Sequence, residues 1–163
     1  MSDEIKKGLL GIVVDEATIS HVVPELSALT YRGYKVQDLC DKCDFEEVAY
    51  LVLYGELPSK NQLKKFIKEE RSHRKLSKKL VKDIKQMPKN AHPMDVVRTC
   101  VSLMALEDKD TKDNSPKANM RKAMRIFAKT PSVVAAYFRA RKGKKIISPN
   151  RKMSYAENFF KMM

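Results

Sequence analysis

Apolar residues recur every three or four positions along most of the chain, and this spacing places them on one face of an α-helix. The segment 76–87 shows the pattern most clearly, because lysines occupy its other face. Its apolar positions are Leu76, Leu80, Val81, Ile84 and Met87. The same spacing runs through residues 45–55, 92–106 and 117–144, and through a segment that begins at Ser59. The pattern predicts a mainly α-helical chain.

Residue pairs at the predicted helix starts support this assignment. A serine or aspartate followed three residues later by glutamate or glutamine forms a capping box, in which each side chain accepts a hydrogen bond from an exposed backbone N–H. The pairs are Asp44 with Glu47, Ser59 with Gln62, and Ser154 with Glu157. Pro93 suits the first turn of a helix, where its missing N–H costs nothing.

The opening of the chain has a different pattern. Residues 8–23, GLLGIVVDEATISHVV, are rich in β-branched and apolar side chains and contain two glycines. This composition predicts one or two short strands before Pro24. We find no internal repeat and no linker, so residues 1–163 are expected to form one unit: an all-α fold with a short N-terminal β-strand or hairpin.

Two features predict interruptions in the second half of the chain. The polar run EDKDTKDNSP, residues 107–116, is typical of a loop. Pro131 lies inside a helical pattern, where its ring removes a hydrogen bond, so we expect a kink near Thr130.

The last ten residues, SYAENFFKMM, predict a short helix whose apolar face needs a partner. That face is expected to consist of Ala156, Phe159, Phe160 and Met163. Left uncovered, such a patch drives association. We therefore expect oligomers or aggregates to form through this end of the chain.

Positive charge is concentrated in one stretch. The net charge is +13, and no acidic residue lies between Asp113 and Glu157. The basic residues there are Lys117, Arg121, Lys122, Arg125, Lys129, Arg139, Arg141, Lys142, Lys144, Lys145, Arg151 and Lys152. Such a field attracts nucleic acid, an anionic membrane surface, or a phosphate-bearing small molecule such as a nucleotide or coenzyme A. The alternative is a set of solvated helix faces with only weak, non-specific binding to nucleic acid.

Candidate catalytic and metal-binding residues are few. Cys40 and Cys43 form a single C-x2-C pair, which could begin a zinc or redox site, but no second pair follows and no histidine has ligand spacing to it. Cys100 lies on an apolar helical face and is expected to be buried. His21 and His73 are isolated. His92 precedes a helix; a histidine there could act as a general acid or base, but it is more often a hydrogen-bonding cap. Pattern alone predicts no catalytic residue, no metal ligand and no defined cofactor-binding residue.

The surroundings of the protein are also constrained by the sequence. No stretch approaches the ~18 consecutive apolar residues that a membrane span needs. The acidic start MSDEIKK lacks the basic region and apolar core of a secretory signal. The odd number of cysteines, three, suits a reducing compartment. We expect a cytoplasmic protein.

Six segments in order closely resemble the N-terminal part of citrate synthase and 2-methylcitrate synthase. They are KGLLGIVVDEATIS, LTYRGYKVQDL, FEEVAYLVLYGELPSKNQL, AHPMDVVRTCVSLMAL, AKTPSVVAAYFRARKGKKIISP and SYAENFFKMM. The resemblance covers about Gly8 to Met163 and does not separate the two substrates. It implies a largely helical homodimeric enzyme with a large and a small domain, of which this chain forms the front of the large domain.

The resemblance also implies a reaction. Enzymes of this family condense an acyl-CoA such as acetyl-CoA with oxaloacetate, using an aspartate base, histidine donors and arginines, and hold no tightly bound cofactor. His21, His73 and His92 do not match the family's catalytic motifs, so no catalytic role carries over to them. Activity is therefore expected to need a separately encoded C-terminal part or a homologous subunit. The alternative is a non-catalytic, basic helical binding module on the same scaffold.

Two departures from the family pattern stand out. Cys40 and Cys43 lie where the family commonly has small residues, which weakens a metal site further. Ser27 and Ala28 precede YRGY where a Gly-Lys-Gly type turn is usual, so the strand turn there is expected to differ.

Overall fold

A computed structural model describes residues 8–9, 11–24 and 28–163. Three short strands come first: β1 (Ser20–Val23), β2 (Ala28–Tyr31) and β3 (Tyr34–Lys35). The helices are α1 (Val36–Lys42), α2 (Phe45–Tyr54), α3 (Lys60–His73), α4 (Lys78–Gln86), α5 (Pro93–Leu106), α6 (Pro116–Arg141) and α7 (Tyr155–Met162). The mainly helical fold with a small N-terminal β-structure is thus confirmed. Within the described residues, no helix is long and apolar enough to cross a membrane.

The N-terminal sheet is antiparallel in the order β1-β2-β3, with Ser20 opposite Tyr31 and Tyr31 opposite Tyr34. β1 lies in the region predicted to form strands, whereas β2, β3 and α1 were not predicted. The turn between β2 and β3 is formed by Arg32 and Gly33, with φ angles of +49° and +86°. Positive φ at both central residues matches the twist of a two-residue hairpin, and glycine adopts it without strain. Ser27 lies outside the described residues.

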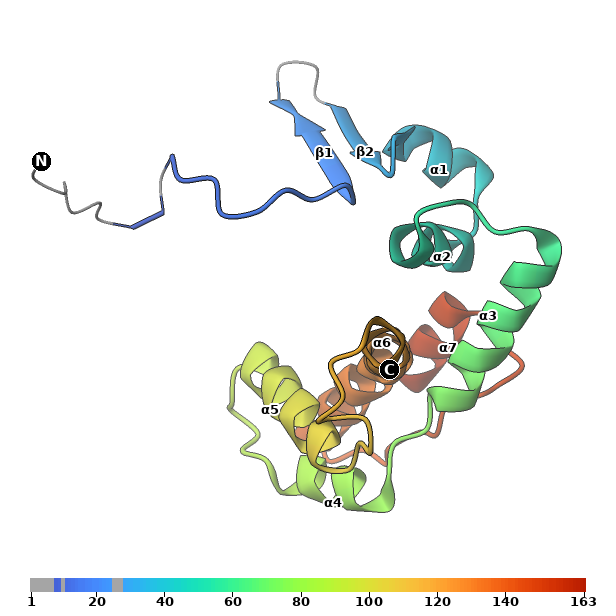
Figure 1. Ribbon diagram of the computed structural model, residues 1–163. Helices are drawn as coiled ribbons and strands as arrows, with labels where there is room; N and C mark the ends of the chain where they lie inside the picture. Colours follow the sequence, from blue (N-terminus) through green and yellow to red (C-terminus); the bar gives the residue numbers. More distant parts are fainter. Residues whose placement is uncertain (1–7, 10, 25–27) are drawn as a thin grey trace, which may run out of the picture.

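α6 is the centre of the helical body, and α3, α4, α5 and α7 all contact it (Figure 1). The larger apolar cluster lies between α4, α5 and α6 and includes Leu80, Ile84, Val96 and Tyr137. The predicted inward face of α4 is therefore correct. Cys100 is fully buried in the same cluster, as expected.

A second apolar cluster joins α2, α3 and α6 through Tyr50, Phe66 and Met124. Aromatic rings extend it to the start of α7. Tyr155 stacks on Phe45 and on Phe127, with ring centroids 4.7 Å apart in both pairs. These contacts link the start of α7 to α2 and to α6.

The predicted helix ends agree with the structure. All three capping boxes are present, at the starts of α2, α3 and α7. Pro93 lies in the first turn of α5, and His92 caps it by accepting a hydrogen bond from the backbone N–H of Met94 at Nδ1, 3.2 Å away. Gly55 ends α2 in the left-handed conformation that glycine favours.

α6 continues through Pro131, which is buried inside the helix. Because proline has no N–H, the carbonyl of Phe127, four residues earlier, loses its helical donor. Tyr155 replaces that donor, since its phenol group donates to the Phe127 carbonyl oxygen at 2.9 Å. A residue of α7 thus satisfies a polar group that the proline leaves open in α6.

The expected inward face of the last helix is wrong. The buried residues of α7 are Asn158 and Met162, and Met162 is only 1% exposed. Phe160 points to solvent and is 74% exposed, and Phe159 is half-buried. α7 therefore packs on α6 and α2 through Asn158 and Met162, each one residue before a member of the predicted face, Phe159 or Met163.

Candidate functional site

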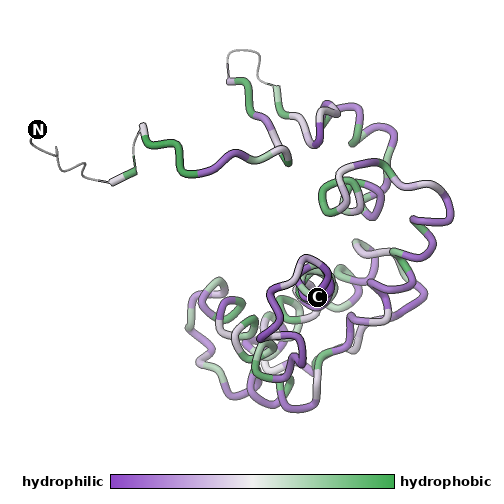
Figure 2. The backbone as a smooth tube through the Cα atoms, in the orientation of Figure 1, coloured by the Kyte–Doolittle hydropathy of each residue, from purple (hydrophilic) through white to green (hydrophobic). Residues whose placement is uncertain are grey.

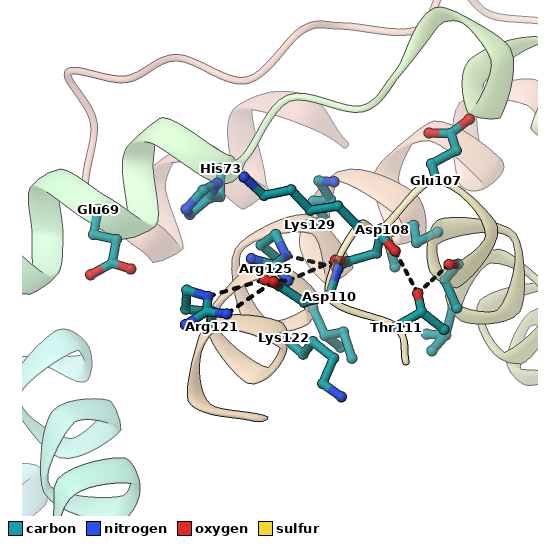
Figure 3. A pocket seen from close by; sticks show the side chains of 15 residues that line it. Glu69, His73, Glu107, Asp108, Asp110, Thr111, Arg121, Lys122, Arg125 and Lys129 are labelled. Atoms are coloured by element: carbon teal, nitrogen blue, oxygen red, sulfur yellow. Dashed lines mark hydrogen bonds and ion pairs between the residues drawn. The ribbon is translucent and has the colours of Figure 1, made fainter. Parts of the chain in front are cut away.

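A cavity of about 690 Å³ lies between the end of α3, the end of α5, the following loop and the first half of α6 (Figure 3). α3 contributes Glu69 and His73, and α6 contributes basic side chains spaced three or four residues apart. The loop after α5 closes the cavity with acidic side chains. The predicted loop at 107–116 is therefore also a wall of this cavity.

Two aspartates of that loop bind two arginines of α6. Arg125 reaches the Asp108 carboxylate through Nε and Nη2, at 2.7 and 2.8 Å, and the Asp110 carboxylate through Nη2 at 2.7 Å. Arg121 forms a two-pronged contact with Asp110, at 3.0 and 2.9 Å. In Figure 3 the two carboxylates point directly at the guanidinium groups. Such two-pronged pairs fix geometry as well as charge.

The arginines hold both carboxylates in their ionised form. Hydrogen bonds from Arg121 and then from Arg125 place the pKa of Asp110 far below its ordinary value. Burial would raise the pKa of Asp108, but hydrogen bonds from the Asp110 backbone and from Arg125 outweigh it and lower that pKa. Carboxylates with such low pKa values are poor proton acceptors, so they are poor candidates for a general base.

These ion pairs neutralise part of the positive charge of the basic stretch. Arg121 and Arg125 are paired with aspartates that precede the stretch, so they contribute less to an open positive field. Lys122 donates to the backbone carbonyl of Asp113 at 2.7 Å. The sequence does not predict this pairing, because Asp and Arg residues 11 to 17 positions apart carry no spacing signal for a contact.

His73 is the one histidine at this cavity within the described chain. Burial lowers its pKa, and the nearby positive charges of Arg125 and Lys129 act in the same direction, against Glu69. It is therefore neutral at pH 7. His21 lies exposed on β1, and His92 is the cap of α5. The three histidines thus lie on three separate elements and form no common site.

Cys40 and Cys43 do not lie in a cluster of potential metal ligands within the described residues. Cys40 is exposed on α1, and Cys43 follows the end of that helix half-buried. In the part of the chain that the structure describes, no three His, Cys, Asp or Glu side chains are placed to hold a metal ion. Cys100 is buried, and burial raises the pKa of its thiol to about 11.

A second charged cluster was not predicted and is fully buried. Glu70 lies in the last turn of α3, and Arg74 directly follows the helix. Their side chains, which are 0% and 1% exposed, form an ion pair at 2.7 Å. Arg74 also donates to the carbonyls of Asn150 and Met153, at 3.0 and 2.9 Å. It therefore ties the segment that precedes α7 to α3. The i,i+4 spacing was visible in the sequence, but the same spacing is common on solvated helix faces.

Comparison with known proteins places this fold in a family. The family model described as "Citrate synthase, C-terminal domain" matches residues 8–163. Citrate synthase of Mycolicibacterium smegmatis is 46% identical over 158 residues, 97% of this chain and 42% of the relative. 2-Methylcitrate synthase of Mycobacterium tuberculosis is also 46% identical, over 98% of this chain and 40% of the relative.

A solved structure agrees. Citrate synthase from Pyrobaculum aerophilum superimposes with a TM-score of 0.88 at 29% identity, over 95% of this chain and 41% of that one. The mainly helical unit with its small sheet is therefore a citrate-synthase-type fold. The chain belongs to the citrate synthase family, as its sequence motifs indicated. It spans about 40% of the length of the curated relatives it matches.

Proposed function

We propose that this chain forms the front of the large domain of a citrate-synthase-type acyltransferase, which condenses an acyl-CoA with oxaloacetate in the cytoplasm. The observation that carries the proposal is the family match, which runs from residue 8 to residue 163. Relatives named citrate synthase and 2-methylcitrate synthase are equally similar, so acetyl-CoA and propionyl-CoA are both candidate substrates.

The chain's role in that reaction is structural. Proton transfer needs a positioned group with a pKa near the working pH. Here Asp108 and Asp110 are held by arginines, and His92 is occupied as a helix cap. His21 and His73 do not match the family's catalytic histidine motifs. We infer that the reacting groups come from residues outside these 163, in a C-terminal part or a second subunit, and that this chain alone does not catalyse the condensation.

A chimaera tests the proposal. This chain replaces the matching segment of M. smegmatis citrate synthase, and free thiol release is measured with oxaloacetate plus acetyl-CoA or propionyl-CoA. We expect acyl-CoA turnover that requires oxaloacetate, because the scaffold and the added catalytic part share one fold. The preferred acyl-CoA would also show whether the front of the domain influences substrate choice.

Two controls make the result decisive. The isolated chain and the isolated M. smegmatis remainder should each show only background thiol release. A chimaera that is soluble and cooperatively folded but inactive would contradict the proposed role. Turnover by the isolated chain that survives further purification would contradict the inference that the reacting groups lie elsewhere.

A further inference from the structure

One side of α4 carries a row of lysines. Lys78, Lys82 and Lys85 are spaced four and three residues apart, so they lie on the same side of the helix, and all three are exposed. With a rise of about 1.5 Å per residue, the row covers roughly 10 Å along the helix axis. α4 lies at the lower edge of the molecule in Figure 1, and hydrophilic positions predominate along it in Figure 2. A row of positive charge therefore faces solvent.

A contact with the end of α6 extends this positive surface beyond the helix. Arg141 donates through Nε to the backbone carbonyl of Lys89 at 2.8 Å. The bond places the basic end of α6 beside the segment that follows α4. Residues 141–145, RKGKK, are all exposed there. We name Lys78, Lys82, Lys85 and Lys89, together with the basic residues of 141–145, the basic ridge.

The charge of the basic ridge is not neutralised within the chain. Among the described residues, none of Lys78, Lys82 and Lys85 forms an ion pair. In the sequence, residues 71–94 and 114–156 contain a single acidic residue, Asp83, which pairs with Lys79 at 3.2 Å. The arginines of α6 at the cavity differ, because aspartates pair with them. The ridge is therefore a part of the +13 net charge that stays open to an anionic partner.

The surroundings of the ridge favour phosphate groups over a lipid surface or unpaired bases. Leu80 and Ile84, on the apolar side of α4, are buried in the core, so they cannot insert into a bilayer as a membrane-surface helix requires. None of the exposed large apolar side chains of the described chain falls within residues 75–89 or 139–152. The ridge thus has no exposed aromatic ring on which a base could stack. Charge alone remains as the means of recognition.

We propose that the basic ridge binds the phosphate backbone of double-stranded nucleic acid without reading its sequence, a property separate from the enzymatic function proposed above. A duplex carries about one negative charge per 1.7 Å of its axis, so the lysine row of α4 faces roughly six phosphate charges. Each lysine that neutralises a phosphate releases a counterion. Affinity should therefore fall steeply with salt, by a slope of about 0.9 in log affinity against log salt for each contact.

Fluorescence anisotropy with a labelled DNA duplex, between about 50 and 200 mM salt, measures this slope for the full chain. Lys78→Gln, Lys82→Gln and Lys85→Gln together should reduce the slope by roughly 2.7 and weaken binding on the order of 100-fold. The matched control removes the same charge from α3, at the exposed positions Lys60, Lys64 and Lys68, and should leave the slope unchanged. Circular dichroism confirms that both variants are folded.

Two outcomes of this comparison would overturn the proposal. Equal losses in the α3 and α4 variants would mean that net charge binds the duplex without the ridge. A strong preference for one duplex sequence over another would mean that base edges are read, which backbone contacts alone do not do.

Further probes identify the partner. An RNA duplex is measured beside the DNA duplex; binding to either supports phosphate recognition, and the tighter one identifies the source. Tighter binding to a single strand of equal length, or ridge-dependent binding only to vesicles of phosphatidylserine and phosphatidylcholine, would contradict the assignment. The chimaera with the M. smegmatis remainder should bind the duplex with the same slope. Loss of duplex binding by a folded chimaera would overturn the proposal, because the added part would then cover the ridge.

Discussion

The hydrogen bond between Tyr155 and the Phe127 carbonyl should be energetically coupled to Pro131. Tyr155→Phe keeps the ring that stacks on Phe45 and Phe127 but removes the donor, at 2.9 Å from the carbonyl oxygen. The carbonyl then has neither its helical donor nor its replacement. Burial raises the pKa of the Tyr155 phenol, so the group stays a neutral donor at every pH used for measurement.

The magnitude follows from the cost of an unsatisfied buried polar group. Leaving a part-buried carbonyl without a donor costs about 1–3 kcal/mol, so Tyr155→Phe should lower the free energy of unfolding by that amount. In a Pro131→Ala background, the restored N–H supplies the helical donor. The same Tyr155→Phe change should then cost about 0.5 kcal/mol or less.

Urea unfolding followed by circular dichroism gives the four free energies of this double-mutant cycle. We expect a coupling free energy of about 1 kcal/mol or more, which such a cycle resolves. Thr130→Ser, a matched change beside the proline, is the control and should leave the Tyr155 effect intact. Equal costs of Tyr155→Phe in both backgrounds would refute the reasoning, because the proline would then not be the source of the open carbonyl.

Three further outcomes are expected from the structure. Arg74→Met should lower the free energy of unfolding by about 3–5 kcal/mol in urea titrations, since it leaves its buried carboxylate partner uncompensated. Asp108→Asn with Asp110→Asn should flatten the pH dependence of thermal stability. Both carboxyl pKa values are lowered in the folded chain, so their contribution is present above the ordinary aspartate pKa of about 3.9 and is lost as pH falls through the lowered values. If the melting temperatures of the wild type and of this variant changed equally from pH 6 to pH 2, the two carboxylates would not be the source of the pH dependence. Phe160→Ser should change unfolding free energy by less than about 0.5 kcal/mol, whereas Met162→Ala should cost about 2–5 kcal/mol; the reverse order in calorimetry would show that α7 packs through the other face.

Much of the helical fold follows from local rules. Helix ends depend on residues three or four apart, so the capping pairs and Pro93 predicted where α2, α3, α5 and α7 begin. β2 and β3 were missed because each is very short and pairs only with its neighbours, so its pattern resembles a loop. The family motifs predicted the fold that the comparisons then showed.

The cavity and the buried pairs could not be predicted in the same way. Asp108 and Asp110 meet Arg121 and Arg125 only because the loop after α5 folds back on α6, a contact that no local spacing encodes. In the sequence, Arg121 and Arg125 belong to a stretch without acidic residues. In the structure, they form ion pairs with Asp108 and Asp110 at the cavity wall.

The sequence by itself determined where helices start and stop, which face of α4 is buried, and the family to which the chain belongs. Those properties depend on short-range hydrogen bonding and on apolar spacing. Tertiary structure alone decided that α7 buries Asn158 and Met162 in place of its phenylalanines. The reason is that Tyr155 is fixed by two aromatic rings and by the carbonyl that Pro131 leaves open, and this anchor sets the rotation of the helix that follows it.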